Sequence, residues 1–102
     1  MEIIRGTTPT IIFTFNQIDV TDITVAYLIF TQNNAEVLEK SISDAVVEDE
    51  KLCFTLSQED TLSLSPFSKA SFSLDWKLAN GTRGRSNIYE TNIGNSGKDE
   101  II

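Results

Sequence analysis

The chain offers few of the side chains on which enzyme chemistry usually depends. Its 102 residues include no histidine, the commonest general base and metal ligand. The single cysteine, Cys53, alternates with Leu52 and Phe54 and has no histidine to activate it, which is typical of a packed thiol. No serine stands in a Gly-x-Ser-x-Gly setting. We therefore expect no enzymatic activity, no catalytic residue and no cofactor.

Two clusters of carboxylates could in principle hold a metal ion. Residues 48–50 read EDE, but they fall at an expected hairpin tip and lack the glycine and spacing of a calcium loop. Glu59 and Asp60 open an expected helical turn, where negative charge stabilises the free N–H groups. Both clusters are thus explained by structure, and we expect no metal site.

The charge balance restricts the possible partners. Fifteen acidic and eight basic residues give a net charge of −7, which would repel a phosphate backbone, so we expect no nucleic-acid binding. No apolar stretch approaches the ~20 residues that span a bilayer, and residues 1–6 do not resemble a signal peptide. These features predict a soluble protein without membrane contact, made in a reducing cytoplasm.

Alternating apolar residues predict a chain built of strands. Residues 10–15, 23–31 and 69–78 show the clearest period of two, and the run at 23–31 is apolar on both faces, which favours a central strand. The predicted core consists of inward-facing residues from several strands. They are Ile11, Phe13, Val25, Ile29, Leu38, Leu52, Phe54, Phe72, Leu74 and Trp76.

Turn-forming residues divide these strands into hairpins. A two-residue turn at 33–34 would place Ile29 opposite Leu38 and Val25 opposite Ile42. A turn at 49–50 would bring apolar residues together in the next hairpin. The expected pairs there are Val47 with Leu52 and Ala45 with Phe54.

Two further local signals complete the pattern. Ser57 and Asp60 have the spacing of a capping box at the start of a helical turn over residues 57–62. The Asn-Gly dipeptide near residue 80 predicts a third hairpin with two possible registers. A two-residue turn pairs Trp76 with Arg85 and Phe72 with Tyr89, whereas a longer loop pairs Trp76 with Ile88.

About seven short strands with regular turn signals predict an all-β fold, an antiparallel sandwich of two sheets with one short helical turn. Residues 1–93 would form this single domain. Residues 94–102 contain two glycines and several charges, and we expect a C-terminal tail that is flexible or ordered by a partner.

Three short motifs carry a resemblance to a known family. Residues 4–9 read IRGTTP, residues 19–23 read DVTDI and residues 56–62 read LSQEDTL, followed by a tryptophan-containing strand and a glycine-rich hairpin. Together they resemble small immunoglobulin-like proteins of tailed phages and prophages, and are similar to the N-terminal domain of phage baseplate upper protein. The resemblance implies an immunoglobulin-like sandwich that is made in the cytoplasm of a bacterial host and then enters the virion.

Two functions remain open at this stage. One is a structural or interaction module of a tail or baseplate, whose partners are other virion proteins or further copies of the chain. The alternative is a stand-alone bacterial immunoglobulin-like domain that binds a peptide or a carbohydrate. In either case the expected partner contacts are apolar chain ends and an arginine pair. They are Ile3, Ile4, Arg83, Arg85, Ile101 and Ile102.

All six residues lie outside the predicted core. Apolar side chains left in water cost about 25 cal/mol per Å², so the isoleucines near both ends need a neighbour. Ile3 and Ile4 could instead join the sheet of their own domain. Arg83 and Arg85 could lie over Trp76 or on an open sheet face.

Overall fold

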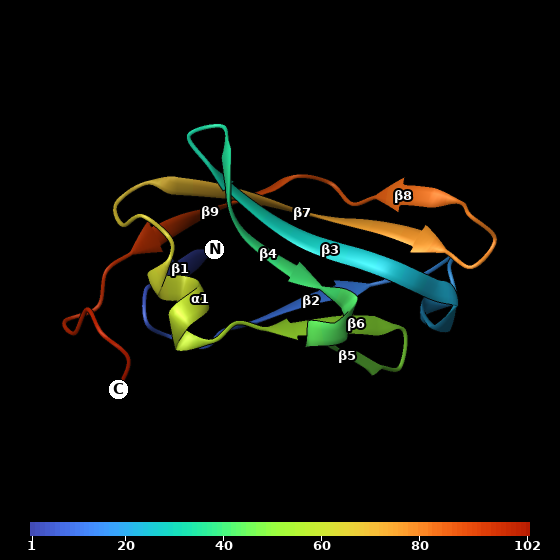
Figure 1. The fold of residues 1–102 in the computed structure, drawn as a ribbon, viewed down its shortest axis with the longest axis horizontal. Coiled ribbons are helices and arrows are strands. Elements are labelled where there is room, and N and C mark those ends of the chain that lie inside the picture. Colours follow the sequence, from blue (N-terminus) through green and yellow to red (C-terminus); the bar gives the residue numbers. More distant parts are fainter.

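A computed structural model describes residues 1–102 and shows two β-sheets packed face to face (Figure 1). The larger sheet has the strand order β1-β9-β7-β3-β4, with β8 also paired to β7, and the smaller sheet has the order β2-β6-β5. The strands are β1 (Glu2–Ile4), β2 (Thr10–Thr14), β3 (Ile23–Gln32), β4 (Ala35–Ser41), β5 (Ala45–Glu48), β6 (Lys51–Thr55), β7 (Lys69–Leu78), β8 (Arg83–Arg85) and β9 (Tyr89–Gly94). The helical turns are η1 (Val20–Asp22), η2 (Ile42–Asp44) and α1 (Gln58–Leu62).

This architecture confirms the predicted all-β sandwich, with differences in detail. There are nine strands, because the N-terminal segment is split between the two sheets and the last hairpin is interrupted between β8 and β9. The sandwich is also not wholly antiparallel, since β1 runs parallel to β9. No helix in the structure has the length and apolar composition that crossing a membrane requires.

The core lies between the sheets and confirms six of the ten predicted positions as buried. They are Ile11, Phe13, Leu52, Phe54, Phe72 and Leu74. Leu38 and Trp76 are half-buried and pack against this core.

The prediction that Val25 and Ile29 belong to the core is wrong. The buried face of β3 is formed by Ala26, Leu28 and Phe30, which are fully enclosed. Alternation alone could not decide between two apolar faces. The choice follows from pairing with β7, which sets the core-facing residues of the two strands side by side.

The turn between β3 and β4 has the predicted length but a different register beyond it. Asn33 and Asn34 both adopt positive φ, 53° and 62°, which a two-residue hairpin turn requires. An irregularity in the ladder then shifts the pairing by one residue, so Leu38 lies opposite Phe30 and not Ile29. Ile42 is not paired with Val25 either, because β4 ends before it and η2 begins.

The second hairpin has the predicted register. Val47 lies opposite Leu52, and Ala45 lies opposite Phe54. The helical turn that follows is capped as predicted, since the Ser57 hydroxyl accepts from the Asp60 N–H and the Asp60 carboxylate accepts from the Ser57 N–H.

The third hairpin follows neither register completely. The Leu78 N–H bonds to the Thr82 carbonyl at 2.8 Å, which leaves a three-residue loop with Gly81 at φ +91°. Trp76 therefore lies opposite Gly84 and not opposite Arg85 or Ile88. The residues between β8 and β9 take up the difference, so the predicted pair of Phe72 and Tyr89 does form.

Candidate binding site: a cleft along the open edge of the small sheet

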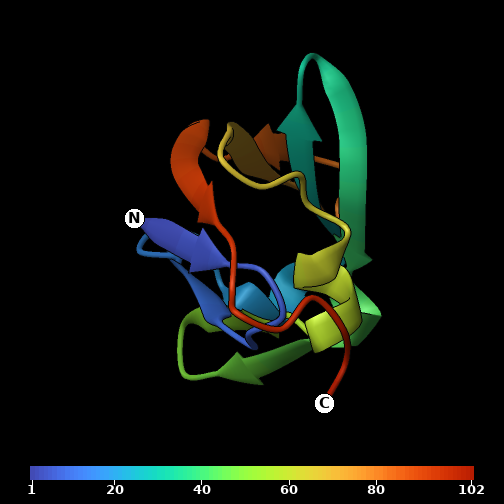
Figure 2. The ribbon, with the colours of Figure 1, turned by 90° about the vertical axis from the view of Figure 1, so that its left-hand side faces the viewer.

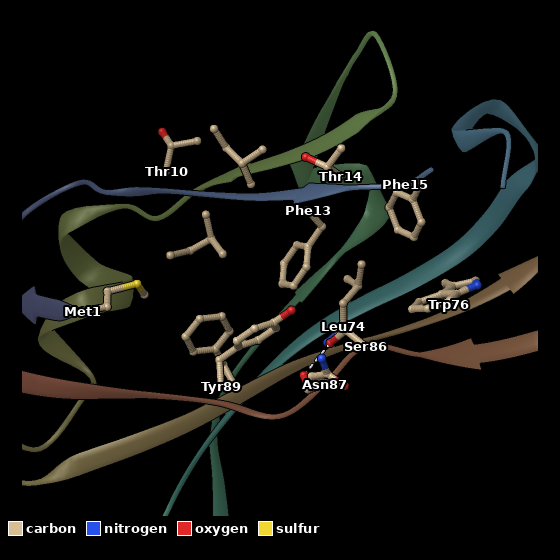
Figure 3. Close-up of a pocket in the computed structure, with 13 residues that line it drawn as sticks. Met1, Thr10, Phe13, Thr14, Phe15, Leu74, Trp76, Ser86, Asn87 and Tyr89 are labelled. Atoms are coloured by element: carbon tan, nitrogen blue, oxygen red, sulfur yellow. Dashed lines mark hydrogen bonds between the residues drawn. The ribbon is translucent and has the colours of Figure 1, made fainter. Parts of the chain in front are cut away.

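An apolar cleft of about 620 Å³ opens along one side of the sandwich. Strand β2 forms one wall, and β7, the residues before β9 and the start of β9 form the other (Figure 3). None of the 15 acidic or 8 basic side chains lines it. The lining residues are Met1, Thr10, Ile11, Ile12, Phe13, Thr14, Phe15, Phe72, Leu74, Trp76, Ser86, Asn87 and Tyr89.

Aromatic rings from both sheets meet across this cleft (Figure 3). The Phe13 and Tyr89 ring centroids are 6.4 Å apart, and those of Phe72 and Tyr89 are 5.4 Å apart. At the end of the cleft away from Met1, Phe15 meets Trp76 edge to face, with their ring centroids 5.3 Å apart and an angle of 87° between the ring planes. These distances are typical of favourable aromatic pairs. Large rings held by both sheets therefore give the cleft a defined apolar surface.

Trp76 owes its position to the residue opposite it on β8. A Cβ atom added to Gly84 would lie 2.5 Å from the indole ring, so only glycine allows the ring to lie this close to the strand. The indole is half-buried, and it forms part of the cleft wall (Figure 3). Gly84 thus shapes the cleft without lining it.

The wall formed by β2 is also an unpaired sheet edge. β2 has a single neighbour, β6, and the Phe15 N–H and Pro9 carbonyl at its two ends both bond toward that strand. Hydrogen bonding alternates along a strand, so every second residue directs its backbone N–H and C=O to the opposite, open side. Those residues are Thr10, Ile12 and Thr14.

The structure places Ile3 inside the chain's own core. Ile3 is 2% exposed and pairs with Ile93 across the parallel ladder of β1 and β9. The idea that it lies outside the core and contacts a partner is therefore wrong, and the alternative that this segment joins the sheet is confirmed. Ile4 is half-buried beside Gly94.

The arginine pair lies on the outer face of the larger sheet. Arg83 and Arg85 are exposed and form ion pairs with Asp75 at 3.6 and 3.3 Å. They do not lie over Trp76, because the inward-facing residue of β8 is Gly84. Asp75 is half-buried, but both arginines are solvated, and ion pairs with a solvated partner at the surface contribute about 1 kcal/mol or less.

The two C-terminal isoleucines are exposed and lie at the end of the sandwich away from β8 (Figure 1). The tail passes α1 (Figure 2), where the Gln58 side-chain amide donates to the Ile102 carbonyl and accepts from its N–H at 2.9 and 2.8 Å. Arg5 pairs with Asp99 and donates to Asn95. The flexibility of this tail stays a prediction.

The six predicted contact residues do not form one surface.

Other chemistry-bearing groups are dispersed. No three histidine, cysteine, aspartate or glutamate side chains lie close enough together to hold a metal ion. Cys53 is a free thiol on the outer face of β6, in register with Ile12 and Val46.

Comparisons of the chain with protein-family models, curated proteins and solved structures find no match.

The alternation of apolar residues does not predict the cleft, although it marks several of its residues. It predicts a closed core that contains Phe13, Phe72 and Trp76. The signal that could have indicated an opening is the absence of any charged residue over positions 6–18. A strand that lacks charge has no device to stop another chain from pairing with it.

Proposed function

We propose that this chain is a non-catalytic structural and interaction module of a phage or prophage virion, associated with a tail or baseplate. The observation that carries the interaction part is the open edge of β2 beside an uncharged apolar cleft. The phage part rests on the resemblance of residues 4–9, 19–23 and 56–62 to immunoglobulin-like tail proteins. Other virion proteins are the proposed partners.

Two properties of the cleft favour a protein partner. Unpaired backbone groups on β2 offer donors and acceptors at the spacing of a strand, and extended chains recognise such edges through main-chain hydrogen bonds. Among the rings of the cleft, Tyr89 is exposed and Trp76 is half-buried, and their uncovered apolar area gains free energy when it is covered, at about 25 cal/mol per Å². Backbone pairing and apolar burial would therefore act together.

A small ligand is the second candidate. The cleft volume of about 620 Å³ lies in the range of small-molecule sites. Its half-buried Trp76 and exposed Tyr89 could stack on a sugar ring. A carbohydrate-array screen tests this role, and a saturable sugar ligand that contacts Trp76 would favour the stand-alone binding domain.

The virion role is tested in two steps. The first is the gene neighbourhood, where tail, tape-measure and lysis genes are expected on either side. The second is mass spectrometry of phage particles purified after induction of the strain that carries the gene. We expect peptides of this chain in stoichiometric amounts with tail proteins. A chain that is expressed but absent from intact particles would contradict the proposal.

A further inference from the structure

We propose that β2 receives an extended segment of another protein as a fourth strand of the small sheet, and that alternate apolar side chains of this segment enter the cleft. The inference rests on the interaction part of the proposed function. It adds the edge that is used and the chemistry of the occupant, which is an extended polypeptide with large apolar residues at every second position.

The backbone of β2 determines the hydrogen-bonding part of this interaction. Thr10, Ile12 and Thr14 each direct one N–H and one C=O away from β6, because their neighbours along the strand bond to it. Only another strand presents donors and acceptors with the same repeat. The edge contains no charge and no proline at these positions, so an incoming chain meets no electrostatic or steric barrier.

The cleft determines the side-chain part. An added strand beside β2 would have side chains on both faces of the small sheet, and those on the inner face would point between the two sheets. Successive inner side chains are about 6.6 Å apart. Two ring pairs, Phe13 with Tyr89 in the middle part of the cleft and Phe15 with Trp76 at the end away from Met1, offer two apolar surfaces for successive side chains (Figure 3).

A second copy of this chain would fit less well. In a pair formed by two β2 edges, the inner side chains of the second strand, Ile11, Phe13 and Phe15, are already buried in their own core. Such a pair would join the backbones but leave both clefts without side chains. Each copy also has a net charge of −7, which opposes self-association. A segment from another protein has free side chains on both faces.

The charges near the cleft suggest how the segment is oriented. The Glu50 carbonyl accepts from the Phe15 N–H at 2.9 Å, which places the acidic hairpin tip of residues 48–50 at the Phe15 end of β2. A basic residue in the partner at that end would be attracted, and an acidic one repelled. We therefore expect basic character on this flank of the occupant.

The test uses the intact, ¹⁵N-labelled chain and synthetic peptides. The probes are acetylated and amidated nonapeptides in which Val, Leu or Phe alternates with Thr. One set has a single Lys at the N-terminal end and the other has a single Lys at the C-terminal end. Control peptides have the same composition with the apolar residues contiguous. We expect the alternating peptides to bind at least tenfold more tightly. They should also slow hydrogen exchange of the Thr10, Ile12 and Thr14 amides, and replacement of the terminal Lys by Glu should weaken binding.

Two proline variants provide the matched comparison. Ile12→Pro removes an outward N–H of β2 without removing a bond to β6, whereas Val47→Pro does the same on the free edge of β5. We expect Ile12→Pro to weaken peptide binding at least tenfold and Val47→Pro to leave it unchanged. The hydrogen-exchange pattern of the unmodified chain decides the matter if Ile12→Pro does not fold.

Three other outcomes of these measurements would overturn the inference, each in a distinct way. Protection confined to β4 or β5 would show that another edge is used, and no binding by any peptide would show that β2 does not accept a strand. Protection of the β2 amides in a concentrated sample without peptide, with a dimeric mass by light scattering, would identify a second copy as the occupant. Absence of the chain from virions alongside specific peptide binding would contradict the proposed virion role alone.

Discussion

The free edges of the two sheets differ in what they present to an incoming strand. One edge of the larger sheet is the short β1, and the other is β4, whose seven residues include Glu36, Glu39 and Lys40. The edge of the smaller sheet is β2, which has five residues and no charge, with the apolar cleft beside it. Charged side chains on an edge oppose pairing with other chains. The difference indicates that β4 is protected from association and that β2 is available for it.

The short edge β5 supports the same distinction. It has four residues, ends in Glu48 and leads directly into the acidic turn. Val46 and Val47 are exposed on it, at 64% and 49%. Its apolar residues are thus followed by charge within the same strand and turn, whereas β2 itself contains no charged residue. Charge carried by the strand itself, more than the number of apolar residues, separates the protected edges from the open one.

The largest loss of stability is expected from a substitution in the closely packed core between the two sheets. Phe54→Ala removes a fully buried ring opposite Ile11 and should lower the free energy of unfolding by roughly 3–5 kcal/mol. Trp76→Ala removes a half-buried ring from the cleft wall and should cost about 1–2 kcal/mol. Urea unfolding of both variants measures the difference. Equal costs would mean that the cleft is as closely packed as the core.

A smaller effect is expected from Gly84→Ala, which changes the cleft wall from behind. The added methyl group would lie 2.5 Å from the Trp76 ring, so the indole must move toward the cleft or the strand must shift. We expect a loss of about 1–3 kcal/mol and a changed emission of Trp76, the only tryptophan in the chain. Gly97→Ala has open space around it and is the control. An unchanged spectrum for Gly84→Ala would contradict the described contact.

The free energy of unfolding should depend on pH in the acid range, because of the contact between Asp60 and Lys40 of β4. Partial burial raises the pKa of Asp60, but hydrogen bonds from the Ser57 N–H and from Lys40, 3.0 Å away on β4, outweigh it and hold the pKa below 3.8. A lowered folded-state pKa gives stability that is present above about pH 4 and lost as the pH falls through that pKa. The urea midpoint of the wild type should therefore fall toward that of Asp60→Asn on acidification. A difference that stays constant from pH 6 to pH 2.5 would contradict this.

Removal of charge from β4 should have the smallest effect on stability. It is also the most direct test of the difference between the β4 and β2 edges. The double variant Glu36→Thr with Glu39→Thr should keep its unfolding free energy within about 0.5 kcal/mol, because both side chains are exposed. It should form dimers or larger species at concentrations where the wild type does not. Sedimentation velocity measures this, and a variant that stays as monomeric as the wild type would show that these charges do not protect the edge.

Features that depend on neighbouring residues could be predicted from the sequence. The turn at Asn33 and Asn34 needs two residues that tolerate positive φ, and the capping box of Ser57 and Asp60 needs only four consecutive positions. The pairing of Val47 with Leu52 follows from a two-residue turn. In each case the physical cause lies within one hairpin or one helical turn.

Features that depend on distant residues could not be predicted in the same way. Ile3 is buried because β1 pairs with β9, about ninety positions away in the chain. The core face of β3 is set by β7, since both faces of β3 are apolar. The cleft needs β2 to lie opposite Trp76 and Tyr89, with no strand on its open side. Apolar alternation marks these strands but does not show where the space between two sheets stays open.

If the uncharged edge of β2 and the cleft beside it form one binding surface, a strand that pairs with the edge must also enter the cleft. Trp76 is the only tryptophan and lies in the cleft wall, so its emission reports directly on what enters. Titration of the unmodified chain with the alternating apolar peptide should shift this emission to shorter wavelength in a saturable manner, with no shift for the contiguous control. Saturable binding of the peptide that leaves the Trp76 emission unchanged would show that the edge and the cleft do not form one surface.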